Sequence, residues 1–123
     1  MATKAERLER ANWVAEAALD KKAADLVALD VSELTSYADT FVIATGTSDR
    51  HARAIADAIR EASIVRGEKP LGVEGYEEGR WVLIDLGDVI VHVFQAEVRA
   101  AYDLERLWSD AQSIDLSAHA ATA

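Results

Sequence analysis

Two short apolar segments joined by a glycine-containing turn constrain the fold of this chain more than any other feature. Residues 80–85 and 88–94 are rich in Val, Ile, Leu and aromatic side chains, and only Leu86 and Gly87 lie between them. Two such segments separated by two residues, one of them glycine, are typical of a β-hairpin. We therefore expect an antiparallel pair of strands over these residues.

Different kinds of side chain gather on the two sides of the expected hairpin. With the two intervening residues as the loop, Asp85 faces Asp88 across the strands. In the same register Trp81 faces His92, and these four residues share one side with Phe94 because side chains alternate along a strand. The other side is purely aliphatic. The hairpin is therefore expected to place one face in an aliphatic core and to present a mixed face opposite it.

This mixed face is a candidate docking site for a partner protein. Like charges opposite each other are unfavourable, so a cationic partner would relieve the repulsion between Asp85 and Asp88. Trp81 supplies the aromatic anchor that is typical of interface hot spots. The alternative is structural: both carboxylates are ordinary turn residues beside Gly87, and Trp81 packs beneath a helix. His92 is expected to be a hydrogen-bonded residue of the sheet rather than a ligand.

The remaining pattern predicts helices before, between and after the strands. Helices are expected over residues 5–22, from the turn at 46–49 to about 66 and over 96–108, and strands over 25–31, 40–45 and, less clearly, 71–75. Thr47 or Ser48 is expected to cap the middle helix. This order predicts an α/β fold with a mixed sheet of about five strands flanked by helices.

The length of the chain, 123 residues, is that of a single domain. We place the α/β domain at residues 1–110 and expect the Ala- and Ser-rich tail, residues 111–123, to be disordered. No apolar run approaches the roughly 20 residues that a membrane-spanning helix needs. The first residues also lack the apolar core of a secretion signal. We therefore expect a cytoplasmic protein without a membrane segment.

Charge favours a basic protein as the partner. The chain has 13 basic and 22 acidic side chains, a formal net charge of −9, which argues against a protein that binds nucleic acid, sequence-specific or not. Residues 67–123 carry a net charge of −7 and residues 1–66 only −2, so an electrostatic partner surface is expected in the C-terminal half. The absence of cysteine excludes disulfides, thiolate catalysis and cysteine-bound zinc.

No pattern of polar residues indicates a catalytic or metal site. Phosphoryl-transfer sites often hold Mg²⁺ between two carboxylates two positions apart on a strand, and neither strand of the hairpin carries this pattern. Asp103 and Glu105 have the spacing, but we expect them on a helix, where such side chains diverge. The histidines, His51, His92 and His119, lack zinc-binding spacing. The turn at 46–48 leaves a phosphate-binding enzyme as a weaker alternative, because one glycine precedes a helix there.

Four segments occur here in the order in which they occur in one known family. They are residues 44–51 (ATGTSDRH), 70–75 (PLGVEG), 81–94 (WVLIDLGDVIVHVF) and 102–108 (YDLERLW). Together they resemble the ribosome silencing factor family, the iojap-like proteins. The resemblance extends over about residues 8–110. It implies a nucleotidyltransferase-like α/β fold that lacks the catalytic carboxylate pair, which agrees with the missing Asp-x-Asp pattern.

The resemblance also implies a function. Family members bind protein fourteen of the large ribosomal subunit and sterically block its association with the small subunit, which lowers translation in starvation or stationary phase. They are homodimers in isolation, no cofactor is expected, and organellar relatives are linked to assembly of the large subunit. Matched to this sequence, the contact residues that the resemblance implies are Trp81, Asp85, Leu86, Gly87, Asp88, Tyr102, Asp103 and Glu105. We therefore expect a non-enzymatic translational repressor, with an assembly factor that uses the same surface as the alternative.

Overall fold

A computed structural model describes residues 3–116 of the chain. The helices and strands follow the predicted order up to residue 95, after which a divided helix and a short sixth strand follow. They are α1 (Lys4–Asp20), β1 (Ala24–Asp30), β2 (Thr40–Gly46), α2 (Asp49–Val65), β3 (Gly72–Glu74), β4 (Trp81–Asp85), β5 (Val89–Gln95), α3 (Ala96–Tyr102), α4 (Leu104–Leu107) and β6 (Gln112–Ser113).

The six strands form one mixed sheet in the order β3-β4-β5-β2-β1-β6. β2 and β5 pair in parallel, whereas β1–β2, β1–β6, β3–β4 and β4–β5 are antiparallel. Every residue of the near-central strand β2 is buried, as its continuous apolar sequence predicts. The predicted fold class, a mixed α/β sheet flanked by helices, is confirmed.

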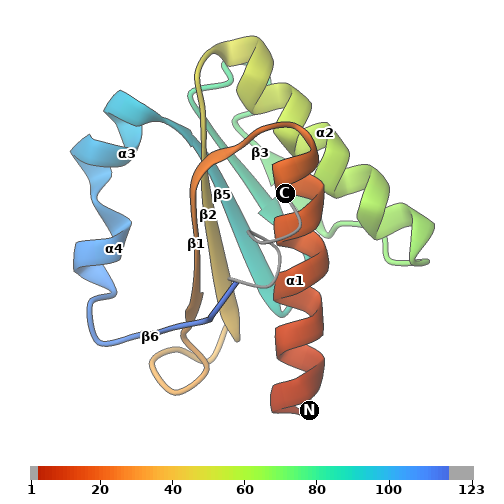
Figure 1. Ribbon diagram of the computed structural model, residues 1–123, viewed down its shortest axis with the longest axis vertical. Coiled ribbons are helices and arrows are strands. Elements are labelled where there is room, and N and C mark those ends of the chain that lie inside the picture. Colours follow the sequence, from red (N-terminus) through yellow and green to blue (C-terminus); the bar gives the residue numbers. More distant parts are fainter. Residues whose placement is uncertain (1–2, 117–123) are drawn as a thin grey trace.

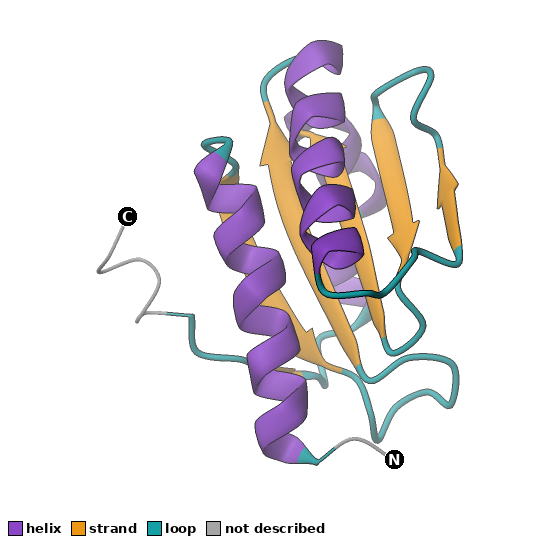
Figure 2. Ribbon diagram, turned by 90° about the vertical axis from the view of Figure 1, so that its right-hand side faces the viewer, coloured by secondary structure: helices purple, strands orange, loops and turns teal. Residues whose placement is uncertain are grey.

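Helices cover the two faces of the sheet unequally. Figure 1 shows α1 and α2 packed on one face, which we call the helical face, and α3 and α4 on the opposite face, which we call the aromatic face. Figure 2 views the helical face, where the two long helices lie side by side. Residues that recur at helical spacing along α2 form its buried side: Ala52, Ile55, Ala56, Ile59 and Ser63.

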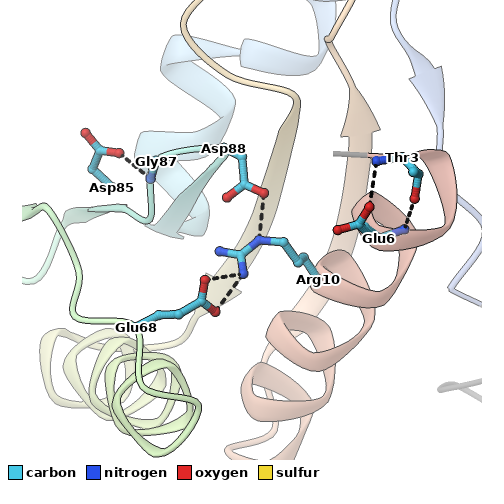
Figure 3. Close-up of polar contacts among 7 residues, drawn as sticks. All are labelled: Thr3, Glu6, Arg10, Glu68, Asp85, Gly87 and Asp88. Carbon is cyan, nitrogen blue, oxygen red and sulfur yellow. Dashed lines mark hydrogen bonds and ion pairs between the residues drawn. The ribbon is translucent and has the colours of Figure 1, made fainter. Parts of the chain in front are cut away.

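Side-chain hydroxyls cap the N-termini of both long helices. The Thr3 hydroxyl accepts a hydrogen bond from the Glu6 N–H at 3.1 Å, and the Glu6 carboxylate accepts one from the Thr3 N–H, which is a capping box (Figure 3). The Ser48 hydroxyl caps α2 by accepting from the His51 N–H at 3.0 Å. Of the two predicted capping residues, Ser48 therefore holds the position.

The register predicted for the hairpin is wrong by two residues. The Leu86 N–H donates to the Val89 carbonyl at 2.9 Å, so the loop consists of Gly87 and Asp88. Gly87 has a φ of +93°, in the left-handed region that favours glycine. Trp81 therefore faces Phe94 rather than its predicted partner. A shift of two residues keeps the strand side chains on their predicted faces, because the alternation also has a period of two. It moves Asp88 into the loop, where its side chain contacts Arg10 of α1 on the helical face instead of lying on the predicted mixed face.

The last predicted helix, over 96–108, is interrupted. It ends at Tyr102, and Asp103 has a left-handed φ of +46° before α4 begins. Aspartate tolerates this conformation better than most residues. The guanidinium of Arg99 binds both carboxylate oxygens of Glu105 at 3.0 and 3.1 Å, so an ion pair stabilises the bend from both sides.

The predicted disorder of the tail is wrong for the part that the structure describes. Residues 112–113 form β6, which pairs with the outer edge of β1 and raises the number of strands from the expected five to six. The Ile114 N–H donates to the Ala28 carbonyl at 2.8 Å, and Ile114 and Leu116 pack against the core of the helical face. An open strand edge with apolar residues nearby explains this pairing. Residues 117–123 lie outside the described part.

Candidate partner-binding site

Trp81 lies at the start of β4 on the aromatic face and is half-buried. Its ring contacts Phe94 of β5, with centroids 4.8 Å apart, and Tyr102 at the end of α3, with centroids 4.7 Å apart. The side chain of Tyr102 is the outer member of this group, because the residue is 59% exposed. The structure thus joins two residues that the sequence singled out separately and leaves both accessible from outside.

A hydrogen bond connects Trp81 to the interior of the sheet. The indole Nε1–H donates to Nδ1 of His92 at 3.1 Å, which confirms the prediction that His92 is hydrogen-bonded within the sheet. His92 is only 5% exposed, and burial lowers its pKa from 6.5 to about 4. The imidazole is therefore neutral at neutral pH. Because Nδ1 accepts, its proton is on Nε2.

Further rings extend this group across the sheet. His92 lies parallel to Phe94, with an interplanar angle of 8° and centroids 5.9 Å apart. Phe41 of β2 meets the ring of His92 edge-on at 5.3 Å and that of Trp108 at 5.1 Å. We call these rings the aromatic cluster: Phe41, Trp81, His92, Phe94, Tyr102 and Trp108. Its interior members are fixed by packing, whereas Trp81 and Tyr102 form its accessible end.

A hollow of about 360 Å³ adjoins the accessible end of the cluster. Its lining residues come from the β3–β4 connection, β4 and α3: Gly75, Glu78, Arg80, Trp81, Glu97, Val98, Ala101 and Tyr102. Glu78 and Glu97 are exposed. The hollow combines aromatic walls with a rim that carries two carboxylates and one guanidinium, which suits a protein side chain that is both apolar and cationic.

The two hairpin carboxylates form interactions within the chain (Figure 3). Asp85 Oδ1 accepts the Gly87 N–H at 2.8 Å, as a turn residue does. Asp88 forms an ion pair with Arg10, with Oδ2 2.7 Å from Nε, and the Arg10 guanidinium also binds both oxygens of Glu68 at 2.7 Å. Burial alone would lower the pKa of Arg10, but the hydrogen bond to Glu68 and the charge of Asp88 outweigh it and raise that pKa. The carboxylate of Asp88 therefore points to α1.

The predicted site residues fall into two groups at opposite ends of β4. Asp85 faces Ile90, and therefore not the Asp88 that the expected register placed opposite it. Trp81 and Asp85 are the first and last residues of the strand, about 13 Å apart at 3.3 Å per residue. Leu86 packs against the core of the helical face. The sequence correctly grouped Trp81 with Asp85 on one face but did not show how far apart they lie.

The remaining predicted residues, Asp103 and Glu105, lie at the break between α3 and α4 and at the start of α4. Asp103 is exposed and directly follows Tyr102. Glu105 is held by Arg99, whose guanidinium also donates to the Thr45 hydroxyl at 2.8 Å and to the Asp25 carbonyl at 2.6 Å. The carboxylate of Glu105 is thus part of an intrachain network that anchors α4 to β1 and β2.

Sequence reasoning missed the residues of α3 that complete the hollow. Glu97, Val98 and Ala101 were considered only as parts of a helix, although Val98, Ala101 and Tyr102 recur at helical spacing. That spacing is the signal from which a shared face could have been recognised. It does not indicate what the face packs against, and the contact with Trp81 is the part that requires the structure.

The enzymatic alternative gains no support from the turn before α2. The Thr47 N–H donates to Nδ1 of His51 at 2.9 Å, and the His51 N–H is used by the Ser48 cap. These donors already have partners in the chain.

Within residues 3–116 no group of three His, Asp or Glu side chains is arranged to hold a metal ion. No helix in this range has the length and apolar character to cross a membrane.

Comparisons with known proteins agree with the motif resemblance. The family model described as "Ribosomal silencing factor during starvation" matches residues 4–123. A ribosomal silencing factor of Bacillus subtilis is 46% identical over 97 residues, which cover 79% of this chain and 82% of the relative. The match to the family model includes the segment of β6 that was expected to lie outside the domain.

Two further relatives are a protein with a crystal structure and a protein whose name places it in mitochondria. A crystal structure of a Chromobacterium violaceum protein superposes with a TM-score of 0.81 at 42% identity, covering 82% of this chain and 84% of that one. A mouse protein named "Mitochondrial assembly of ribosomal large subunit protein 1" is 30% identical over 92 residues, 72% of this chain and 40% of the mouse protein.

Proposed function

Because this chain belongs to the family of ribosomal silencing factors, we propose that it represses translation by binding the large ribosomal subunit through the accessible end of the aromatic cluster. The bound chain occupies space that the small subunit needs, so the two subunits do not associate. Repression then requires only occupancy, without catalysis or a cofactor. We place this activity in the cytoplasm, where ribosomes translate, and expect it under starvation or in stationary phase.

The single observation that supports this site is the contact between Trp81 and Tyr102. Two large rings with centroids 4.7 Å apart, partly accessible and supported from beneath by buried rings, have the composition of an interface hot spot. Aromatic side chains of this kind provide a large contact area at a small entropic cost, because few torsion angles have to be fixed.

Charge supports a basic protein as the direct contact, and we propose protein fourteen of the large subunit. The whole chain carries a net charge of −9. Near the hollow, the exposed carboxylates of Glu78, Glu97 and Asp103 are available to cationic side chains. Such rim charges set orientation and association rate more than affinity. They direct a cationic partner toward the rings.

The other residues implied by the family take secondary roles in this proposal. Asp85, Leu86 and Gly87 lie at the periphery of the contact, at the far end of β4. Asp88 and Glu105 act chiefly through the fold, since Arg10 and Arg99 already bind their carboxylates.

In isolation we propose a homodimer. Exposed apolar residues such as Leu107 of α4, which is 72% exposed, favour self-association. Light scattering after size-exclusion chromatography tests this part by itself. A monomeric mass over the micromolar range would contradict the dimer and leave the ribosome proposal unaffected.

The mouse relative favours a second candidate function, assembly of the large subunit, since its name refers to that process. Both functions use the same surface in our proposal. They differ in what a deletion strain accumulates. Precursors of the large subunit would indicate assembly, whereas normal subunits with a failure to lower translation on starvation would indicate silencing.

Sedimentation through sucrose tests the proposed function. The chain is mixed with separated subunits, and the complementary subunit is then added. We expect the chain to sediment with the large subunit alone and to reduce the number of joined ribosomes. Trp81→Ala should weaken this binding by roughly 30-fold, which corresponds to about 2 kcal/mol.

Glu77→Ala is the matched control, because Glu77 is an exposed carboxylate near the site but outside the hollow. We expect it to bind as the unmodified chain does. Equal binding of both variants would contradict the site, and no binding of the unmodified chain to either subunit would contradict the function. Binding without an effect on joining would favour the assembly alternative.

A further inference from the structure

The indole of Trp81 has one hydrogen-bond partner in the described chain, Nδ1 of His92. Ring contacts with Phe94 and Tyr102 hold the indole from two sides, but Tyr102 is itself 59% exposed, so these contacts alone leave the indole some freedom to rotate. A directional hydrogen bond at 3.1 Å does not, because its strength falls steeply with angle. The bond to His92 is therefore the contact that selects one orientation of the indole.

We propose that His92 is a positioning residue, which holds the Trp81 indole in the orientation that the ribosomal partner recognises. This inference rests on the proposed function, since it takes Trp81 to be the anchor of the contact. His92 does not itself reach the partner, because it is 5% exposed and lies behind the rings of the cluster.

His92 is well suited to this role because its own orientation is fixed. It lies parallel to Phe94, with an interplanar angle of 8°, and meets Phe41 edge-on at 77°. Both of these rings are buried in the sheet. The buried rings thus fix His92, and its hydrogen bond fixes the half-exposed indole of Trp81. The indole is therefore pre-organised before a partner binds.

The second ring nitrogen argues against a purely structural role for His92. Nε2 is buried and has no hydrogen-bond partner within residues 3–116. A buried polar atom without a partner lowers stability, so an apolar side chain would suit the core better at this position. The benefit that offsets this loss is the acceptor at Nδ1, and the only described group that uses this acceptor is the Trp81 indole.

Nuclear magnetic resonance of the full chain tests the geometry without the ribosome. Trp81→Phe identifies the indole N–H signal of Trp81. In His92→Phe, which keeps a ring of similar shape and removes the acceptor, we expect this signal to move upfield as its hydrogen bond is lost. In His92→Asn, whose side-chain oxygen lies near the former Nδ1, the signal should stay close to its original position. An indole signal that is unchanged in His92→Phe would overturn the inference.

The affinity of each variant for purified large subunits tests whether the orientation of the Trp81 indole matters for binding. Loss of one net hydrogen bond corresponds to a two- to ten-fold effect, and we expect His92→Phe to bind about five-fold more weakly. His92→Asn should recover most of this loss. His51→Phe is the matched control, since Nδ1 of His51 also accepts a hydrogen bond, but from the Thr47 N–H and not from a ring of the cluster. We expect it to bind normally.

The outcomes separate this inference from the proposed function. If Trp81→Ala loses binding while His92→Phe and the unmodified chain bind alike, the positioning role is wrong and the site stands. If Trp81→Ala binds normally, the proposed site itself fails. A loss of affinity in His92→Phe that His92→Asn does not recover, with equal melting temperatures, would also contradict the role of the acceptor.

Discussion

The two faces of the sheet differ in the helices that cover them and in the side chains beneath those helices. Two helices of 17 residues each cover the helical face, and the strand residues under them are aliphatic. The aromatic face is covered by helices of seven and four residues, separated by a residue with a left-handed φ. Its side chains combine aliphatic residues with several rings, and one of these rings is a buried histidine.

We infer from this difference that the helical face mainly stabilises the fold, whereas the aromatic face mainly recognises a partner. A fully covered aliphatic face contributes hydrophobic free energy and offers little that is specific to a partner. A face that is incompletely covered, with rings held by directional contacts, loses some stability and gains a surface that another protein can recognise. The predictions below test this division of roles, in order of decreasing effect.

The largest effect is expected from truncation within the helical face. Ile59 is completely buried between α2 and the sheet, so Ile59→Ala should lower the free energy of unfolding by about 3 kcal/mol. Ile64→Ala on the same helix is the control, since Ile64 is 56% exposed and should lose less than about 1 kcal/mol. Urea denaturation measures both. Equal losses would mean that this face is not the main source of stability.

The aromatic face should make stability depend on pH. The pKa of His92 is about 4 in the folded chain and near 6.5 in the unfolded chain, so the unfolded state binds the extra proton between these values. The contribution is complete above about pH 6.5 and is lost as the pH falls toward 4. It amounts to about 3 kcal/mol at 1.36 kcal/mol per pKa unit. Denaturation at several pH values should show this slope, and His92→Phe should flatten it. An unchanged slope would contradict a buried neutral imidazole.

Arg10 should matter to folding more than to recognition. It joins Asp88 of the hairpin loop to Glu68 after α2, and its side chain is only 16% exposed. We expect Arg10→Ala to lower the free energy of unfolding by about 2 kcal/mol, because two carboxylates lose their partner. Arg50→Ala at an exposed position should have almost no effect. If Arg10→Ala instead weakened binding to the large subunit without destabilising the chain, Asp88 would belong to the contact.

The smallest of the four effects concerns the exposed ring of the site. Tyr102→Ala should weaken binding to the large subunit about ten-fold, or 1.4 kcal/mol, and change stability by less than about 1 kcal/mol. Tyr37 offers a matched control, because it is also exposed, at 62%, and lies in the β1–β2 loop, where its ring contacts Phe41 at 6.4 Å instead of Trp81. Figure 1 shows this loop at the opposite end of the sheet from α3. Equal affinities of the two variants would exclude Tyr102 from the contact.

The two faces were predictable from the sequence to a large extent. Alternation along the two strands assigned their side chains to the correct faces even though the register was wrong, because the error was two residues and side chains alternate with the same period. Asp88 is the exception, because it lies in the loop and its carboxylate contacts Arg10 of α1. The buried side of α2 followed from its helical spacing. Such patterns reflect burial, which local sequence encodes directly.

The details of the site depend on contacts between distant residues and were not predictable. Either Leu86 with Gly87 or Gly87 with Asp88 could form a loop with glycine, and local sequence does not distinguish them. In the structure, the Arg10 guanidinium and the backbone N–H groups of residues 39 and 40 bind Asp88 and stabilise the observed loop. The contact between Trp81 and Tyr102 likewise joins residues that are far apart in the sequence.

The structure of the chain bound to the large ribosomal subunit, determined by electron cryomicroscopy, tests the central claim most directly. We predict that Trp81 and Tyr102 lie in the interface with a basic ribosomal protein, and that α1 and α2 do not touch it. The bound chain should also overlap the position of the small subunit. A complex in which α1 and α2 form the contact and the aromatic cluster faces solvent would contradict the account.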